Sequence, residues 1–326
     1  MLACWAGTRS GHQLMTQVEI AEDAPGFAHL ALFYQGPWEY RAGAVPFILE
    51  GLAADVPVAV AAPGPRLRLL CDALGADAER VQLLDMTVAG RNPGRIIAEV
   101  LLAIADAHPD RHVRIIGEPI WPGRSAIEYP ACVQHEALIN LAFRGRRATI
   151  LCPYDVTALD PVVVADAAAT HPTLIQRGRT SSSPDYAPQR ILSAYNRPLP
   201  EPPDAAVLSF DAPRLSLARR AATEHARRAG MDEERVEDVQ LAVGELAANS
   251  LRHGGGSGVL RMWADADHWI CEVRDVGWIT DPLAGRRPAS LTQRAGRGLL
   301  MVNHLADLVR THTRPAETTI RAYFRL

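Results

Sequence analysis

The chain contains the segment Val239-Gln-Leu-Ala-Val-Gly-Glu-Leu-Ala-Ala-Asn-Ser-Leu-Arg-His-Gly-Gly-Gly256, which has the spacing of a helix that ends in consecutive glycines. Glu245, Asn249 and His253 recur at every fourth position, so a carboxylate, an amide and an imidazole share one helical face. The opposite face is apolar and can pack on a sheet: Val236, Val239, Val243, Leu246 and Ala247. A carboxylate that can accept a proton, one turn from an oxygen that can bind a hard cation, suits metal-assisted phosphoryl transfer. Taken alone, the segment also fits a solvated polar face on an ordinary core helix.

Two glycine-containing elements follow this helix. The first is an alternating strand that ends at Asp275, and Gly277 two residues later lets the backbone come close to a flat ligand. The second is a helix opened by Gly296, Arg297 and Gly298. Free N–H groups and the positive dipole end at such a helix start favour phosphate oxygens, and an Arg adds a charge-assisted contact. The order of the three elements is far more specific than any one of them.

In these motifs, residues 205–326 resemble the ATP-binding domain shared by gyrase, Hsp90, histidine kinases and MutL, and most closely its anti-sigma-factor serine/threonine kinase branch. The resemblance implies a two-layer α/β sandwich, the Bergerat-type fold, with ATP and Mg²⁺ held between the helices and a mixed sheet. It implies that Glu245 is the general base and Asn249 the Mg²⁺ ligand, and that Asp275 accepts the adenine amino group. The implied ATP-binding residues are Asn249, His253, Asp275, Gly277, Gly296, Arg297, Gly298 and Leu299.

One position departs from the family pattern. The family commonly writes Asp-x-Gly-x-Gly, whereas this chain has Ile279 at the last place. Adenine recognition is compatible with this change, but the mobility of the lid that follows is in question. Residues 280–295 are the predicted lid.

Composition limits the function classes that need consideration. At 326 residues and 48% hydrophobic content there is enough chain for two cores, and a net charge of -3 gives no basic field for direct nucleic-acid binding. The absence of Lys excludes a Walker A lysine, a Schiff-base lysine and a Ser-Lys pair.

No apolar run reaches the roughly 18 residues that a membrane span needs. The cysteines are scattered, which fits reduced thiols in the cytoplasm: Cys4, Cys71, Cys132, Cys152 and Cys271. Residues 1–26 are predicted to be a disordered N-terminus without a signal peptide, and Met15 is an alternative to Met1 as the start.

A proline-rich spacer at residues 197–204 separates a first half, 27–196, from the second, 205–326. Strand-like and helix-like segments alternate in the first half, which predicts a doubly wound, mainly parallel sheet. The predicted strands are 29–34, 57–61, 81–85, 113–117 and 148–152. The predicted helices are 40–54, 66–74, 93–107, 125–143 and 161–169, the last of which closes the series, and 179–184 is predicted as a loop. Pro63 and Pro65 follow the second strand, at the place where a nucleotide-binding protein of this architecture has its phosphate loop. Proline has no backbone N–H to donate, so we predict no phosphate loop here.

Several motifs of the first half carry a second resemblance. They are Gly90-Arg-Asn-Pro-Gly-Arg-Ile-Ile97, Arg114-Ile-Ile-Gly-Glu-Pro-Ile-Trp-Pro-Gly-Arg-Ser125, His135-Glu-Ala-Leu-Ile-Asn140, Cys152-Pro-Tyr-Asp155 and Thr170-His-Pro172. With them, residues 27–196 resemble the MEDS sensory domain, a RecA-like module of bacterial and archaeal regulators, which implies a small-molecule ligand. The candidate ligand residues lie at strand ends or on the following helix: Glu118, Trp121, Arg124, His135 and Glu136. Each is equally compatible with a structural polar group.

Two further patterns have weaker meanings. His135-Glu136 is similar to a histidine-kinase phosphoacceptor, but that role needs a two-helix hairpin just before the ATP domain, which the chain lacks. Cys132, His135 and Cys152 offer a single Cys-x-x-His as ligand spacing, so we expect buried thiols rather than a metal site.

The sequence therefore predicts a cytoplasmic signalling protein in which a small-molecule sensor controls an ATP-dependent serine/threonine kinase. The predicted protein partner is an anti-sigma-factor antagonist or a sigma factor. Two alternatives stay open: a non-catalytic, ATP-dependent binding switch, and a sensor histidine kinase. A homodimer is an assembly that the sequence leaves open.

Overall fold

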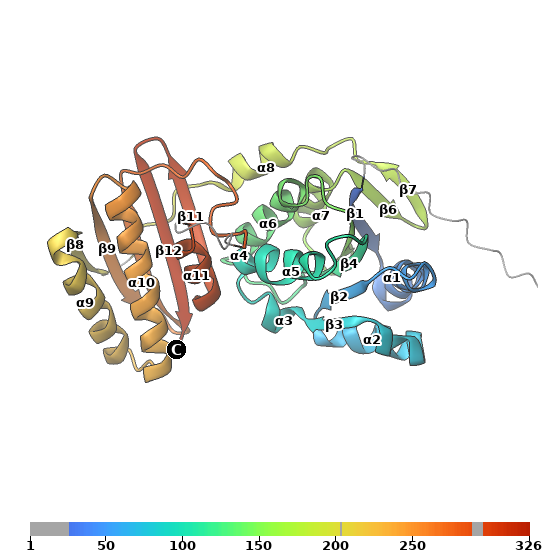
Figure 1. Ribbon diagram of the computed structural model, residues 1–326, viewed down its shortest axis with the longest axis horizontal. Helices are drawn as coiled ribbons and strands as arrows, with labels where there is room; N and C mark the ends of the chain where they lie inside the picture. Colours follow the sequence, from blue (N-terminus) through green and yellow to red (C-terminus); the bar gives the residue numbers. More distant parts are fainter. Residues whose placement is uncertain (1–25, 203, 289–295) are drawn as a thin grey trace, which may run out of the picture.

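Two sheets organise the chain, as Figure 1 shows for the computed structural model. The structure describes residues 26–202, 204–288 and 296–326. The predicted disordered N-terminus with Cys4 and Met15, except for Gly26, and the last part of the predicted lid, 289–295, lie outside the described residues. We call the seven-stranded sheet with its helices the N-terminal body, and the five-stranded sheet with its helices the C-terminal body.

The N-terminal sheet has the strand order β3-β2-β4-β5-β1-β6-β7 and is parallel except for the β6–β7 pair. Its strands are β1 (Phe27–Tyr34), β2 (Val58–Ala62), β3 (Gln82–Asp85), β4 (Val113–Gly117), β5 (Ala148–Asp155), β6 (Thr173–Gln176) and β7 (Arg179–Ser182). Successive side chains of a strand point to opposite faces of the sheet. Both faces are buried under helices, so the central strands contribute to two cores. On β1, Ala31 and Phe33 belong to one core, and Leu30 and Leu32 belong to the other. The predicted doubly wound α/β architecture is confirmed.

The helices of this body are α1 (Gly36–Ala53), α2 (Gly64–Leu74), η1 (Gly75–Arg80), α3 (Met86–Ala89), α4 (Pro93–Ile96), η2 (Ile97–Leu101), α5 (Leu102–Asp106), α6 (Tyr129–Ala142), α7 (Pro161–Thr170) and α8 (Pro188–Tyr195). The predicted helix 93–107 is interrupted by π-helical turns at η2. The predicted start at residue 125 is wrong, since α6 begins at Tyr129. The Glu128 carboxylate accepts hydrogen bonds from the Ser125 N–H at 2.9 Å and from its hydroxyl at 2.8 Å, which closes a turn before the helix.

The end of this body corrects two further predictions. The helix at 161–169 does not close the series, because β6, β7 and α8 follow it. Residues 179–184 are not a loop throughout, since Arg179–Ser182 forms β7 and pairs antiparallel with β6. Arg177 and Gly178 both have positive φ, 51° and 72°, as a two-residue hairpin turn requires.

The C-terminal body is a two-layer α/β sandwich with the strand order β11-β12-β10-β9-β8. Its elements are β8 (Ala206–Asp211), η3 (Ala212–Arg214), α9 (Leu215–Arg228), α10 (Glu233–His253), β9 (Ser257–Ala264), β10 (His268–Asp275), α11 (Gly298–Leu305), β11 (Leu308–Arg314) and β12 (Glu317–Arg325). Each strand pair of this sheet is antiparallel over the described residues. The prediction of a mixed sheet, with parallel and antiparallel pairs, is therefore wrong. Trp269 and Val273 face α9 and α10, whereas Ile270 on the other face packs with Ala131 of α6.

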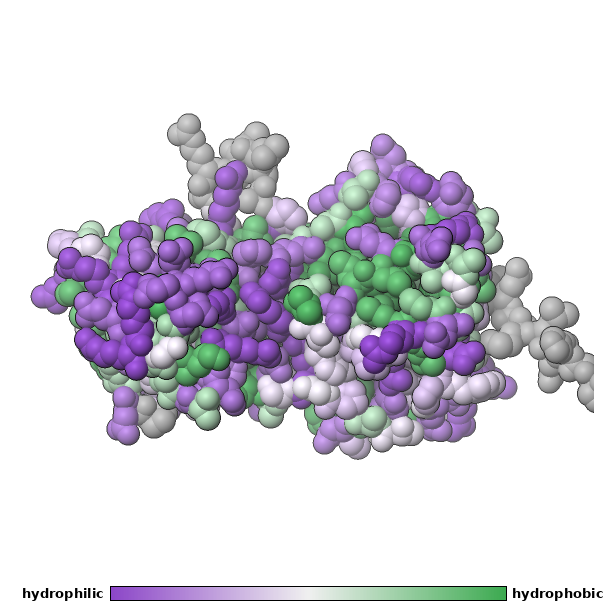
Figure 2. All heavy atoms as spheres, turned by 90° about the horizontal axis from the view of Figure 1, so that it is seen from below, coloured by the Kyte–Doolittle hydropathy of each residue, from purple (hydrophilic) through white to green (hydrophobic). Residues whose placement is uncertain are grey.

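Hydrophilic residues cover much of the C-terminal body in the view of Figure 2, and hydrophobic residues gather on the N-terminal body. Among the helices described, none combines the length and apolarity of a membrane span. The two bodies meet where α11 lies beside α4 (Figure 1).

Candidate functional site

Helix α10 positions the first predicted site residues. It begins after Asp232, whose side chain caps the helix by accepting a hydrogen bond from the Arg235 N–H at 2.8 Å. Its apolar face is buried in the core, and Glu245 and Asn249 lie half-buried on the other side. The Glu245 carboxylate lies 3.9 Å from the Arg252 guanidinium, which is longer than a hydrogen bond.

The start of α11 lies directly against these two side chains. A Cβ atom on Gly298 would be 2.6 Å from Glu245 Oε2 and 3.2 Å from Asn249 Nδ2. Any side chain at position 298 would therefore displace the ends of the Glu245 and Asn249 side chains. The first turn of α11, with its free N–H groups, faces the carboxylate and the amide of α10. The structure thus brings together two motifs that the sequence separates.

Asp275 forms the third part of the site at the end of β10. Its carboxylate accepts hydrogen bonds from the Ser250 hydroxyl at 2.5 Å and from the Gly277 N–H at 2.8 Å. Gly277 cannot carry a side chain, because a Cβ would lie 2.7 Å from the His253 carbonyl oxygen. The Gly277 carbonyl in turn accepts a hydrogen bond from the Thr318 hydroxyl at 3.0 Å. Asp275 is therefore held in one orientation.

Ser250 and Thr318 were missed by sequence reasoning. Ser250 follows Asn249 directly on the same helix, so its position beside a predicted ligand was a usable signal. Thr318 offered no such signal, because the pairing of β12 with β10 is a long-range property of the fold.

The other predicted ATP-site residues are placed as follows. His253 is exposed at the end of α10, and Gly296 and Arg297 are exposed just before α11, where Arg297 is the N-cap residue. Leu299 is half-buried and packs on Gly285, where an added Cβ would lie 2.6 Å from the Leu299 Cβ.

The described part of the predicted lid, residues 280–288, is called the lid root here. Just before it, the Ile279 N–H donates a hydrogen bond to the Thr313 hydroxyl at 2.9 Å, which ties the chain to β11. Leu283 is 2% exposed and belongs to the core of the N-terminal body. Arg286 donates a hydrogen bond to the Pro93 carbonyl at 3.4 Å, and burial lowers the pKa of its guanidinium to about 10. The lid root is therefore docked on the other body.

Asn303 of α11 contacts both the lid root and the N-terminal body. Its backbone carbonyl accepts a hydrogen bond from the Asn92 amide at 2.8 Å, and its own amide donates to the Gly285 carbonyl at 2.9 Å. Gly94 makes the approach close, because a Cβ there would lie 2.0 Å from Asn303 Oδ1. One residue, Asn303, thus links α11, the lid root and the turn before α4.

A cavity of about 270 Å³ lies between the two bodies. It is lined by α6 and α8 of the N-terminal body and by the lid root, α11 and β11 of the C-terminal body. Trp278, Ile279 and Leu299 contribute its apolar wall, and Asp281 and Arg286 contribute charge.

Glu118 lies at the carboxyl end of β4, where open α/β sheets bind ligands. It is buried 3.8 Å from Arg66, which also contacts the Asp155 carboxylate at 3.3 Å. Burial is the main cause that raises the pKa of Glu118 to about 8. The hydroxyls of Tyr34 and Tyr40, whose rings pack near the Arg66 guanidinium, have no hydrogen-bond partner among the described residues.

The structure does not gather the other predicted sensor residues around Glu118. The Arg124 guanidinium stacks 4.0 Å from the Trp121 ring and donates to the backbone carbonyls of Gly90 and Arg91. This pair therefore has the contacts of structural groups.

His135 and Glu136 are both buried on α6. Burial lowers the pKa of His135 to about 3, so its imidazole is neutral near pH 7. Glu136 faces His29 and His171, 3.3 Å from each. Cys132 and Cys152 are buried as expected, and burial raises the pKa of the Cys132 thiol to about 12.

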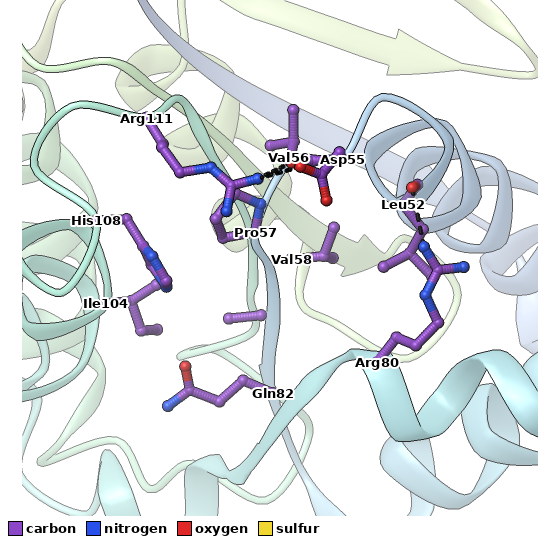
Figure 3. Close-up of a pocket in the computed structure, with 11 residues that line it drawn as sticks. Leu52, Asp55, Val56, Pro57, Val58, Arg80, Gln82, Ile104, His108 and Arg111 are labelled. Carbon is purple, nitrogen blue, oxygen red and sulfur yellow. Dashed lines mark hydrogen bonds and ion pairs between the residues drawn. The ribbon is translucent and has the colours of Figure 1, made fainter.

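A second cavity, of about 300 Å³, lies at the amino ends of β2 and β3. Figure 3 shows the ion pair between Arg111 and Asp55 at its rim, with His108 and Gln82 along the wall. Open α/β sheets bind ligands at the opposite edge, so we assign this cavity no site.

Two family models match the chain. The model of the MEDS domain, the methanogen/methylotroph, DcmR sensory domain, matches residues 28–172. The model of the histidine kinase-like ATPase domain matches residues 208–324. The chain thus contains a MEDS domain at residues 28–172, followed by a histidine kinase-like ATPase domain at residues 208–324. No curated protein matches it.

Solved structures give weaker similarity. The structure of the RsbU and RsbW domains of a Mycobacterium tuberculosis protein is 19% identical with a TM-score of 0.29, over 38% of this chain. The match spans 33% of that structure's own length. The Acinetobacter baumannii histidine kinase AdeS is 11% identical with a TM-score of 0.22, over 61% of this chain and 96% of its own.

Proposed function

We propose that this chain, which joins a MEDS sensory domain to a histidine kinase-like ATPase domain, is a cytosolic protein kinase under the control of a small molecule. The proposed reaction transfers the γ-phosphoryl group of ATP to a Ser or Thr of a partner protein, an anti-sigma-factor antagonist. The single observation that carries the proposal is the close approach of Gly298 to Glu245 and Asn249.

The residues around this contact fit a nucleotide with its metal ion. Gly298, Gly277 and Gly254 each lie where a Cβ would collide with neighbouring atoms, so the site has a glycine-lined wall. Asn249 offers an amide oxygen to Mg²⁺, which when bound would neutralise phosphate charge. Arg297 and the first N–H groups of α11 would hold phosphate oxygens.

Glu245 is proposed to take the proton from the acceptor hydroxyl. It is half-buried at the same wall, within reach of a group that lies over Asn249 and Gly298. Asp275 is proposed to accept the adenine amino group, since Ser250 and Gly277 already fix the orientation of its carboxylate. Catalysis would then depend mainly on positioning and charge neutralisation.

The acceptor is proposed to lie on another protein. His135, the histidine that a phosphoacceptor role would use, is 1% exposed. A buried imidazole cannot reach a nucleotide at the α10–α11 wall without unfolding of α6. This argues for transfer to a partner rather than to the chain itself.

Control by the sensor is proposed to act through the lid root. Leu283 and Arg286 of the lid root contact the MEDS domain, and Asn303 of α11 donates a hydrogen bond to Gly285 between them. A ligand that changes the packing around Leu283 would therefore change the position of the lid root relative to α11.

The test is incubation of the full chain with γ-labelled ATP, Mg²⁺ and candidate antagonist proteins. Acid-stable label on the antagonist is expected, and Glu245→Gln is expected to keep ATP binding while losing transfer. Acid-labile label would replace this proposal with a histidine kinase. Normal turnover by Glu245→Gln would remove Glu245 from the role of base.

One observation favours a second candidate function, an ATP-dependent switch that binds its partner without phosphorylating it. Ile279 stands at the usual second glycine, and its N–H is tied to Thr313. Such a switch would change its affinity for the partner on ATP binding, yet transfer no label with the wild-type or the Glu245→Gln protein.

A further inference from the structure

Four side chains that can bind a metal ion meet inside the MEDS domain, independently of the nucleotide site. They are His29 of β1, Glu136 of α6, Cys152 of β5 and His171, which follows α7. Each is at most 1% exposed. The site lies between the sheet and its covering helices, because His29 and Cys152 point to the same face of neighbouring strands.

The four ligand atoms lie within 4.8 Å of one another, and three of the distances between them are close to those of a coordination shell. Glu136 Oε2 lies 3.3 Å from His29 Nε2 and 3.3 Å from His171 Nε2. Cys152 Sγ lies 3.5 Å from His29 Nε2. A tetrahedral ion with bonds of about 2.0–2.3 Å places its ligand atoms about 3.3–3.7 Å apart.

The outer contacts fix the direction of both imidazoles. The Nδ1 atom of His29 lies 3.1 Å from Asn140 Oδ1, and the amide nitrogen of Asn140 donates to the Thr170 carbonyl at 2.8 Å. Since this leaves the Asn140 oxygen as the acceptor, His29 carries its proton on Nδ1. His171 Nδ1 lies 2.8 Å from the Ala167 carbonyl, which can only accept, so it carries its proton there too. Both Nε2 lone pairs therefore point into the cluster, as in metal-binding histidines with an outer oxygen partner.

Inside the cluster Glu136 faces the imidazoles of His29 and His171, which are positively charged only if protonated. In the described part of the chain, three atoms of the cluster have no hydrogen-bond partner. They are both carboxylate oxygens of Glu136 and the Nε2 atom of His171. Two nitrogen lone pairs and a carboxylate thus converge in a space without water access. Burial of such groups without compensation is costly, and a cation among them would remove that cost.

We propose that the MEDS domain binds one Zn²⁺ ion through His29, Glu136, Cys152 and His171. Two imidazoles, a thiolate and a carboxylate are ligands that zinc accepts in tetrahedral geometry, and the thiolate argues against Mg²⁺ or Ca²⁺. Because the residues come from β1, β5, α6 and the end of α7, the ion would join the sheet to its helices. Binding converts the Cys152 thiol into a thiolate and releases its proton to the solvent.

The test uses the full chain, purified without an affinity tag and washed with a weak chelator. Elemental analysis is expected to find one zinc per chain, and replacement by Co²⁺ is expected to produce a thiolate-to-cobalt charge-transfer band. Cys152→Ser should abolish that band. Cys132→Ser is the matched control, because Cys132 is a buried thiol of the same domain outside the cluster.

Asn140→Ala supplies a variant that leaves all four ligands in place. Loss of its contact with His29 is expected to weaken zinc binding by about 10- to 100-fold in a competition with a chromophoric chelator. The proposal is overturned if the wild-type protein holds no metal after exposure to Zn²⁺. It is equally overturned if Cys152→Ser and Cys132→Ser give the same cobalt spectrum as wild type, or if another metal outcompetes zinc at this site.

Discussion

Substitution of Leu283 by Ala is expected to release the lid root from the MEDS domain while both domains stay folded. The Leu283 side chain is 2% exposed and packs in the MEDS core, although its own chain segment belongs to the ATPase domain. Truncation of a buried Leu to Ala costs about 2–5 kcal/mol. If this whole cost falls on the docked state of the lid root, the equilibrium constant for its opening rises by at least roughly 30-fold. The factor follows because about 1.4 kcal/mol corresponds to a factor of ten.

Hydrogen exchange followed by mass spectrometry measures this opening. Backbone amides of residues 280–288 should exchange at least roughly 30-fold faster in Leu283→Ala, whereas the strands of both sheets keep their protection. The matched control is Leu260→Ala, which removes an equally buried Leu from β9 inside the ATPase core. Unchanged exchange of residues 280–288 in Leu283→Ala, together with a global loss of stability, would show that Leu283 does not hold the lid root.

Three further variants test separate parts of the structure. Asp275→Asn is expected to weaken ATP binding by on the order of 1–3 kcal/mol, because a buried amino donor would lose its charged acceptor, and calorimetry that finds unchanged affinity would contradict this role. Gly94→Ala is expected to push the Asn303 side chain away, since the new Cβ would lie 2.0 Å from Asn303 Oδ1, and limited proteolysis should then cut the lid root faster than in wild type. Glu118→Gln is expected to flatten the pH dependence of stability: the folded pKa of Glu118 is raised to about 8 from an ordinary value of 4.5, so the unfolded chain loses this proton first. The wild-type free energy of unfolding should therefore fall relative to that of the variant, by up to about 5 kcal/mol, as the pH rises from 4.5 to 8, and parallel denaturation curves for the two proteins across that range would refute it.

The architecture was largely predictable because its signals are local. The alternation of strands and helices in the first half reports burial on both faces of a parallel sheet, and the observed β1 to β5 follow it. The hairpin of β6 and β7 escaped because Arg179–Ser182 is polar and pairs only at the sheet edge. Its signal was the Arg177-Gly178 turn, which needs positive φ at both positions.

The wall between α10 and α11, which is proposed to hold the nucleotide, was predictable for a different reason. Glu245 and Asn249 lie one helical turn apart, and Gly298 marks a position where a side chain would collide with them. Spacing and residue type together therefore indicate the chemistry. The docking of Leu283 had no such signal, because an apolar residue in a loop does not show which core it enters.

The cluster in the MEDS domain shows the same limit more strongly. His29, Glu136, Cys152 and His171 have no ligand-pair spacing, and the Cys-x-x-His that does, Cys132 with His135, lies outside the cluster. Each residue comes from a different element, so the parallel pairing of β1 with β5 and the packing of α6 bring them together. Only the three-dimensional structure contains that information.

The two domains share contacts that make the position of α11 sensitive to the MEDS core. Leu283 is fixed in that core, Gly285 two residues later packs on Leu299, and Leu299 follows Gly298 directly. A Cβ added at Gly298 would lie 2.6 Å from Glu245 Oε2, so the start of α11 and the Glu245 carboxylate cannot move independently. We therefore expect a small displacement of the lid root to change the space in front of Glu245. In the proposed function, a ligand of the MEDS domain would act in this way without touching the nucleotide. Because packed interfaces shift between discrete arrangements rather than deform smoothly, this contact chain is suited to switching the site between two states.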